Sequence, residues 1–255
     1  AALAFWRVGQ TEDVLGASPV NRPARIQPDY GGLVIPPNIA PLNFSMLEEG
    51  TRYYAVVRGN QGVPIKIRSR GPAIAIPLRP WQALIKLNPG GELYFDLYAK
   101  TGKTGWQRFS VMTNTLAPEP IDPYLFYRKI YPYHNSWSSM GLYQRSLESY
   151  DERLLLKTEC CHCHSLCNND PSRFSVDIRS ERYGSSLLLV QNGTVQKLTG
   201  TVGFSSWHPS GRLLASSFNK PRLLLHSQRN DMRDIVEFDA WLGYFFVGSN
   251  VVRRI

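Results

Sequence analysis

Cysteine is scarce in this sequence of 255 residues, and all of it lies in one place. The four cysteines are Cys160, Cys161, Cys163 and Cys167, and the remainder of the chain has none. A disulfide framework that joins distant segments is therefore excluded. What remains is one local chemical site, and the spacing of its thiols decides its nature.

Long hydrophobic runs are absent as well. No stretch approaches the roughly 18 to 20 apolar residues that a membrane-crossing helix requires. The apolar opening, residues 1–6, ends at Arg7. We interpret this opening either as the remnant of an anchor or signal segment upstream of residue 1, or as a short buried strand.

Acidic residues are outnumbered by basic ones. The chain has 20 aspartates and glutamates against 29 lysines and arginines, which gives a formal net charge of +9. This excess predicts either an acidic partner or a solvated basic surface. The basic residues are scattered, without the run or the motif of a nucleic-acid-binding protein, so we expect no nucleic acid partner.

Motifs for phosphate, acyl or metalloprotease chemistry are missing too. The sequence has no glycine-rich phosphate loop, no Gly-x-Ser-x-Gly elbow and no His-Glu-x-x-His. The stretch Thr101-Gly102-Lys103-Thr104 lacks the upstream glycine of a phosphate loop and falls in a predicted hairpin turn. We therefore expect a protein that is not an enzyme.

What the chain does contain is the pattern C-x-x-C-H at Cys160, Cys163 and His164. This pattern is the attachment signature of c-type haem. The two thiols form thioethers with the vinyl groups of one haem, and the histidine after the second thiol binds the iron as its proximal ligand. The sequence therefore predicts one covalent haem c, and leaves the roles of Cys161 and Cys167 open.

Two other interpretations of the cysteines stay open. A zinc site would use Cys160, Cys163 and Cys167 with His162 or His164, but the sequence has no second Cys-x-x-Cys pair. A redox dithiol is expected in a thioredoxin-like βαβ context, which the sequence does not predict.

A second axial ligand would decide what the haem does. With His164 alone the iron is five-coordinate and open to small ligands, whereas a sixth ligand from the chain favours electron transfer. The distal candidates are His226, at the end of an apolar stretch, and Met140 as the alternative. Core packing is the other interpretation of both residues, and His208 is expected to be structural within its Trp-His-Pro-Ser-Gly turn.

Short segments rich in β-formers, separated by glycine and proline, predict an all-β chain. The clearest hairpin joins residues 93–98 to 106–111, and an Asn-Gly turn joins residues 186–190 to 194–198. One helix is predicted over residues 80–86, before a Pro-Gly-Gly sequence that ends it.

These elements divide the chain into five parts. They are an irregular lead-in over 1–30, a β-sandwich-like domain over 31–117, a proline- and aromatic-rich connector over 118–159, a haem c attachment loop over 160–185, and blades of a partial β-propeller over 186–255. The last part is too short to close a ring, because a propeller needs about four or more blades.

Several segments together resemble one known family. They are residues 35–44, 117–128, 140–145, 163–171 and 207–212, the last reading Trp207-His208-Pro209-Ser210-Gly211-Arg212. In combination they are similar to the TolB-like β-propeller proteins of the bacterial envelope that carry an embedded C-x-x-C-H motif. The resemblance spans about residues 30 to 250. It implies an N-terminal β domain, one covalent haem c and a propeller.

The resemblance also bears on single positions. Both His226 and Met140 match the family pattern, whereas Cys161 stands where the pattern has another residue. The family pattern has a histidine near Asp177, which this chain lacks. Family members are much longer than 255 residues, so the propeller here is cut short, either in nature or because the sequence covers only a fragment.

One function is expected from these observations, with two alternatives. The expected function is that of an extracytoplasmic c-type cytochrome subunit, in the periplasm or the outer cell envelope. It passes single electrons to other redox proteins or cytochrome subunits of a membrane-associated or extracellular assembly. One alternative is a TolB-like scaffold or binding protein whose haem or zinc site is structural. The other is an enzyme that uses an open coordination position on the iron.

Overall fold

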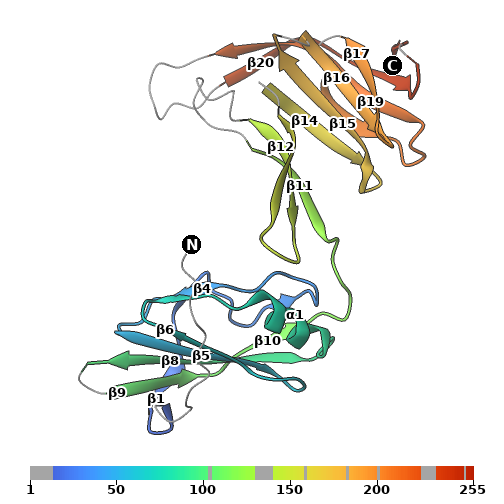
Figure 1. The fold of residues 1–255 in the computed structure, drawn as a ribbon. Coiled ribbons are helices and arrows are strands. Elements are labelled where there is room, and N and C mark those ends of the chain that lie inside the picture. The colour runs from blue at the N-terminus through green and yellow to red at the C-terminus, as the bar shows by residue number, and fades with distance from the viewer. Residues whose placement is uncertain are drawn as a thin grey trace. The chain divides into compact units, whose positions relative to one another are not determined.

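The structure, a computed structural model, describes residues 14–102, 105–129, 140–157, 160–181, 184–199, 202–224, 234–249 and 251–255. The described chain is all-β with one α-helix, as the sequence predicts. Residue contacts divide it into two compact units (Figure 1). The N-terminal unit comprises Ala1–Leu125 and Arg145–Asp151, and the C-terminal unit comprises Phe126–Gln144 and Glu152–Ile255.

The largest sheet of the N-terminal unit has seven strands. They are β1 (Ser18–Pro23), β3 (Val34–Ile35), β5 (Arg52–Gly59), β6 (Ile65–Ser69), β8 (Glu92–Thr101), β9 (Gly105–Ser110) and β10 (Met112–Leu116). Strand β8 is central, because β5 pairs along one of its edges while β9 and β10 share the other. The predicted hairpin of residues 93–98 and 106–111 is thereby confirmed as β8 and β9.

Alternation in the sequence of β8 explains why this sheet has one buried face. Its apolar residues are fully buried in the core of the unit: Leu93, Phe95, Leu97 and Ala99. The residues between them are half-buried on the other face, because successive side chains of a strand point to opposite sides.

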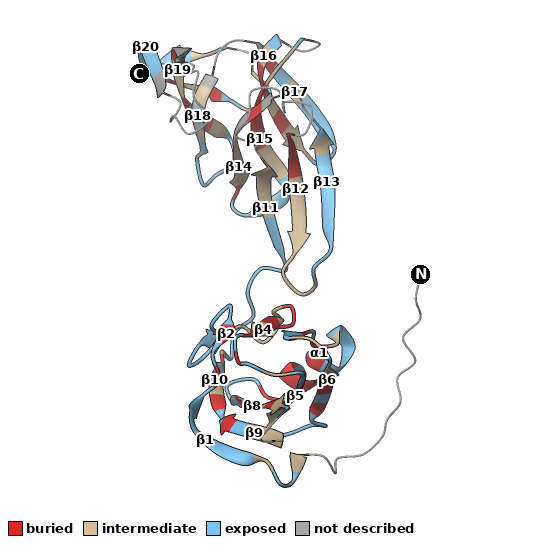
Figure 2. Ribbon diagram, turned by 90° about the vertical axis from the view of Figure 1, so that its left-hand side faces the viewer, coloured by how far each residue is buried: buried red, intermediate tan, exposed pale blue. Residues whose placement is uncertain are grey.

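The single helix, α1 (Leu78–Lys86), packs on this core (Figure 2). It buries Trp81, Leu84 and Ile85, which share one face at helical spacing. The Nε1 of Trp81 donates a hydrogen bond of 2.8 Å to the carbonyl oxygen of Ile39, so the buried indole has a partner. The predicted helix is confirmed and begins two residues earlier than expected. Within the described ranges no helix is long and apolar enough to cross a membrane.

A small three-stranded sheet completes the N-terminal unit. It consists of β2 (Ile26–Gln27), β4 (Phe44–Met46) and β7 (Ala73–Ile74), with β4 in the middle.

The C-terminal unit contains three sheets that follow one another along the chain. The first comprises β11 (Tyr124–Lys129), β12 (Gly141–Ser146) and β13 (Glu152–Lys157). The second comprises β14 (Cys160–Cys167), β15 (Asp170–Ser180), β16 (Gly184–Gln191) and β17 (Thr194–Thr199). The third comprises β18 (Val202–Trp207), β19 (Leu213–Leu224), β20 (Asp234–Phe246) and β21 (Arg253–Arg254). Across the residues described, none of these sheets closes into a ring.

Two hydrophobic clusters join these sheets. Leu142 of β12 packs with Cys161 of β14 and Val176 of β15, on one side of the second sheet. Leu187 of β16 packs with Leu214 of β19, on the other side. The second sheet therefore has apolar contacts on both faces and forms the centre of this unit.

Two predicted parts of the chain have more regular structure than expected. Most of 160–185, predicted as a loop, forms the strands β14 and β15, which a turn at Asn168 and Asn169 joins. The motif specifies ligand chemistry but not backbone conformation, and the apolar residues of β15 draw the segment into the sheet. The predicted connector, 118–159, contains β11, β12 and β13. Its aromatic residues pair across these strands, as Tyr127 and Tyr143 do with ring centroids 6.1 Å apart.

Candidate functional site

The C-x-x-C-H motif lies on β14, the edge strand of the second sheet. Strand β14 pairs only with β15, so its backbone is held along one side. Among the described strands only β15 pairs with it, but side chains from the neighbouring sheets also reach its backbone: the Nε1 of Trp207 donates a 3.1 Å hydrogen bond to the carbonyl oxygen of Ser165.

A β-bulge interrupts this pairing inside the motif. Cys161 pairs with Ile178, but His164 pairs with Val176, so β14 has one residue more than β15 between these pairs. In a regular strand, positions three apart lie on opposite faces. The extra residue changes this alternation, and both Cys161 and His164 contact the Phe126 side of the sheet.

The same bulge places the two thiol positions of the motif, 160 and 163, on one face of β14. Positions 160 and 163 precede Cys161 and His164 directly, so they share the opposite face of β14. Position 160 pairs with Arg179, and Asp177 lies opposite the bulge. The bulge therefore gives C-x-x-C one common side, although the segment is a strand.

The three cysteines whose side chains are described differ in how far they are buried. Cys161 and Cys167 are each 1% exposed, whereas Cys163 is only half-buried. All three are free thiols. The side chains of Cys160 and His162 lie outside the described residues. The buried pair is closed to a large reagent, and Cys163 is the described thiol that a cofactor can reach.

The electrostatic surroundings of Cys163 are mixed. Burial raises the pKa of its thiol; the charge of Arg128 lowers this pKa and the charge of Asp177 raises it. Arg179 and Glu237 make smaller contributions of opposite sign. Burial, the largest of these effects, therefore favours the protonated thiol.

Asp177 is the most unusual residue beside the motif. Its side chain is 1% exposed, and neither carboxylate oxygen has a hydrogen-bond partner within the described part of the chain. Burial raises its pKa to about 7, against a lowering by Arg179. A buried carboxyl without a partner is costly, so it marks a position that packing alone does not explain.

His164 lies on the Phe126 side of β14. The two rings meet edge to face with centroids 4.9 Å apart. Burial lowers the pKa of the imidazole, a hydrogen bond with the backbone of Phe126 raises it, and the charge of Arg128 lowers it. Arg128 also donates a 2.8 Å hydrogen bond to the carbonyl oxygen of Cys161. The lowered pKa keeps the imidazole neutral at pH 7, which is the form that binds metals.

Of the two candidates for the distal iron ligand, only Met140 lies within the described residues. Met140 is 9% exposed and lies two residues before Leu142, which packs against Cys161. His226 lies outside the described residues. His208 is exposed, and its Nδ1 lies 2.8 Å from the Oγ of Ser210, as expected for a structural role in its turn.

No described cluster of three or more histidine, cysteine or acidic side chains has the arrangement of a metal site. Sequence reasoning identified the motif but not its surroundings. It missed the bulge and the burial of Asp177, since both depend on the pairing of β14 with β15. No local signal could have found this burial, because Asp177 occupies a polar position in the alternation Phe174-Ser175-Val176-Asp177-Ile178-Arg179, which predicts an exposed side chain.

No family model matches this chain, and no curated protein is significantly similar to it.

Proposed function

We propose that this chain is a c-type cytochrome subunit that carries one covalent haem c on Cys160 and Cys163 and transfers electrons. The observation that carries the proposal is the β-bulge in β14, which gives the two C-x-x-C positions a common side at the edge of a sheet. Without the bulge, two thiol positions three apart on a strand lie on opposite faces, where one haem cannot join them.

The chemistry of the donor set agrees with this proposal. Cys163 is accessible, while Cys161 and Cys167 are buried and do not compete for the vinyl groups. His164 is neutral and supplies an imidazole next to the second thiol. When bound, the haem supplies a one-electron redox centre.

His164 is the residue that must move. Its ring packs against Phe126 on the other face of β14 from position 163. Iron ligation therefore requires the ring to leave Phe126. Because β14 pairs with another strand along one edge only, this local rearrangement breaks fewer ladder hydrogen bonds than it would in a central strand.

Residues around the motif are proposed to set the polarity of the haem site and to supply its second axial ligand. Asp177 stands near the position where the family resemblance expects a histidine, and its carboxyl is buried opposite the bulge. Arg128 fixes the backbone of Cys161 through its hydrogen bond. As a distal ligand, Met140 is favoured among the described residues, since it lies close in sequence to the cluster around Cys161; His226 is the second candidate.

The wider proposal follows the TolB-like resemblance. Three consecutive sheets with hydrophobic clusters between them support a partial propeller, and the large sheet of the N-terminal unit supports a sandwich-like domain. Covalent haem attachment takes place outside the cytoplasm, so the proposed location is the periplasm or the outer envelope. The proposed partners are other redox proteins or cytochrome subunits of a larger assembly.

The test is a pyridine haemochrome spectrum of the full chain, made in a host that attaches haem c. The protein is denatured and extracted with acid acetone before the spectrum is recorded. A c-type band that survives extraction supports the proposal. Cys163→Ser is expected to abolish or shift this band, whereas the matched variant Cys161→Ser is expected to keep it. Loss or shift of the band in both variants, or in neither, would contradict the assignment.

A second measurement separates the remaining functions. If no band is retained and zinc is found instead, the scaffold alternative replaces the cytochrome. If the reduced haem protein binds carbon monoxide, the iron has an open position and the enzyme alternative gains support. A six-coordinate spectrum that carbon monoxide does not change agrees with electron transfer.

A further inference from the structure

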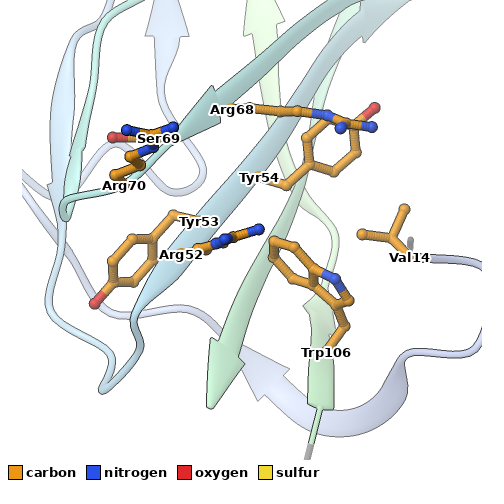
Figure 3. Close-up of a pocket in the computed structure, with 8 residues that line it drawn as sticks. All are labelled: Val14, Arg52, Tyr53, Tyr54, Arg68, Ser69, Arg70 and Trp106. Carbon is orange, nitrogen blue, oxygen red and sulfur yellow. The ribbon is translucent and has the colours of Figure 1, made fainter. Parts of the chain in front are cut away.

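A pocket of about 240 Å³ opens on the large sheet of the N-terminal unit (Figure 3). Three arginines line it: Arg52 at the start of β5, Arg68 on β6 and Arg70 just after β6. Tyr54 of β5 and Trp106 of β9 also contribute to its wall. With Tyr53, which also lines it, the pocket thus combines three positive charges with three aromatic residues.

The register of the strands explains how these residues come together. Arg52 pairs with Lys100, and Lys100 pairs with Trp106 on the next strand. In the neighbouring row, Tyr54 pairs with Arg68. Paired residues project from the same face of an antiparallel sheet, so both rows share the face opposite Ala55 and the core.

Within the described ranges, the three arginine side chains of the pocket have no partner of opposite charge. The side chains of Arg52, Arg68 and Arg70 form no ion pair or hydrogen bond with any group that the structure describes. By contrast, Arg58 on the same strand as Arg52 forms a 2.9 Å ion pair with Asp96. Like charges directly opposite each other, such as Arg52 and Lys100, destabilise a sheet. A bound anion would remove this repulsion.

The aromatic rings hold the cations in place. The guanidinium carbon of Arg68 lies 5.6 Å from the ring centroid of Tyr54, and the ammonium of Lys100 lies 5.9 Å from that of Trp106. The Nε1 of Trp106 is shielded from solvent and has no hydrogen-bond partner among the described residues. The ring of Trp106, rather than its shielded N–H, contributes to the pocket wall.

We propose that this pocket binds the phosphate group of a small anionic ligand. A phosphate monoester carries a charge of about −1.5 to −2 at pH 7 and three strong acceptor oxygens. Guanidinium groups match such oxygens two at a time. Three guanidinium groups exceed what a single carboxylate can satisfy. The volume lies just below the roughly 300 Å³ at which pockets for drug-sized ligands begin, so it suits a phosphate with a small attached group.

Two sources of this phosphate are compatible with the pocket: a soluble phosphate ester and the headgroup of an anionic phospholipid. Isothermal titration of the full chain with inorganic phosphate and with phenyl phosphate tests the first, and succinate serves as the dicarboxylate comparison. Co-sedimentation with vesicles of phosphatidic acid and phosphatidylcholine tests the second, because phosphatidic acid carries a phosphate monoester headgroup. Each experiment is repeated with the double variant Arg52→Gln/Arg68→Gln. It is also repeated with Arg79→Gln, which removes an exposed arginine of α1 outside the pocket.

The double variant is expected to weaken phosphate binding about tenfold or more, because it removes two charge-assisted contacts. Arg79→Gln is expected to leave binding unchanged. Binding of the soluble phosphates alone identifies a soluble ester, and additional binding of the vesicles identifies a lipid headgroup. The proposal fails if none of these probes binds, or if the vesicles bind without inorganic phosphate. It also fails if succinate binds as tightly as phosphate, or if Arg79→Gln weakens binding as much as the double variant.

Discussion

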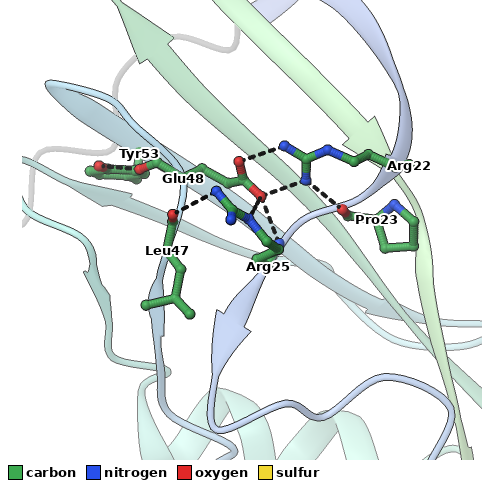
Figure 4. A network of polar contacts seen from close by, with 6 residues as sticks. All are labelled: Arg22, Pro23, Arg25, Leu47, Glu48 and Tyr53. Atoms are coloured by element: carbon green, nitrogen blue, oxygen red, sulfur yellow. Dashed lines mark hydrogen bonds and ion pairs between the residues drawn. The ribbon is translucent and has the colours of Figure 1, made fainter.

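Arg22 holds the carboxylate of Glu48 through two hydrogen bonds, from Nη1 to Oε1 at 2.6 Å and from Nη2 to Oε2 at 2.8 Å (Figure 4). The backbone N–H of Arg25 donates a third bond of 2.7 Å to Oε1. The Glu48 side chain is only 6% exposed. These contacts join the end of β1 to the segment that follows β4, so the Glu48 carboxylate contributes to the stability of the N-terminal unit.

Replacement of this carboxylate by an amide is the first prediction. Glu48→Gln keeps the shape of the side chain but loses the charge-assisted hydrogen bonds, and its NH₂ group faces donors. We expect the free energy of unfolding to fall by about 2 kcal/mol, the usual contribution of hydrogen bonds to a charged group. Urea unfolding of the full chain measures this loss. The control is Glu49→Gln, at an exposed neighbouring position, which should change stability little. Equal losses in both variants would argue against a specific role of Glu48.

Acid should weaken the same contact. The hydrogen bond from Arg22 lowers the pKa of Glu48 most strongly. Burial raises this pKa, and the hydrogen bond from the backbone of Arg25 lowers it again, so that it lies at about 2, below its ordinary 4.5. A carboxyl whose pKa is lowered on folding stabilises the fold above its unfolded pKa, and this stabilisation is lost as the pH falls. The wild type should therefore lose more stability than Glu48→Gln between about pH 4.5 and about pH 2. Unfolding midpoints over this pH range test the difference, and parallel curves for the two proteins would refute it.

Asp177 should have the opposite pH dependence, because burial raises its pKa to about 7 from the ordinary 3.8. The folded chain favours the protonated acid, so ionisation costs stability as the pH rises through this interval. In protein made without haem, Asp177→Asn removes this cost. We expect the variant to be more stable than the wild type by roughly 2 to 4 kcal/mol at pH 8, and the gap to close near pH 4. Thermal unfolding at both values measures the gap, and a gap that does not change with pH would rule out ionisation as its cause.

Local patterns predict much of this fold. The helix over Leu78–Lys86 and the hairpins follow from periodicity and turn residues, which act over a few positions. The bulge beside Cys163 and the burial of Asp177 depend on which strand pairs with β14, and no local pattern specifies that pairing. The arginine pocket is a similar case, since Arg52 and Trp106 meet only through the register of β5, β8 and β9. Sequence reasoning therefore identified the motif but neither its surroundings nor the second site.

The turn between β16 and β17 allows a matched test of backbone strain. Asn192 and Gly193 both have positive φ, 47° and 82°, as a tight hairpin turn requires. A Cβ added at Gly193 meets nothing within 4 Å, so Gly193→Ala costs only backbone strain. We expect a loss of about 1 to 2 kcal/mol in unfolding free energy. Gly71→Ala is the control, because it has the same open space without a positive φ. Urea unfolding of both variants measures the contrast, and equal effects would show that conformation is not the cause.

Thiol labelling tests whether Cys163 is more accessible than Cys161 and Cys167. In folded protein made without haem, Cys163 should react with iodoacetamide, while Cys161 and Cys167 should react only after unfolding, because each is 1% exposed. Burial raises the pKa of Cys163, so its labelling should be slower than that of an open thiol and should accelerate as the pH rises. Light reagent applied to the folded chain and heavy reagent applied in urea distinguish the two classes. Tandem mass spectrometry of the tryptic peptide 158–173 assigns the label to each cysteine. If Cys161 or Cys167 took up the light reagent as fast as Cys163, the buried pair would be accessible to haem, and the selection of Cys163 by burial would be wrong.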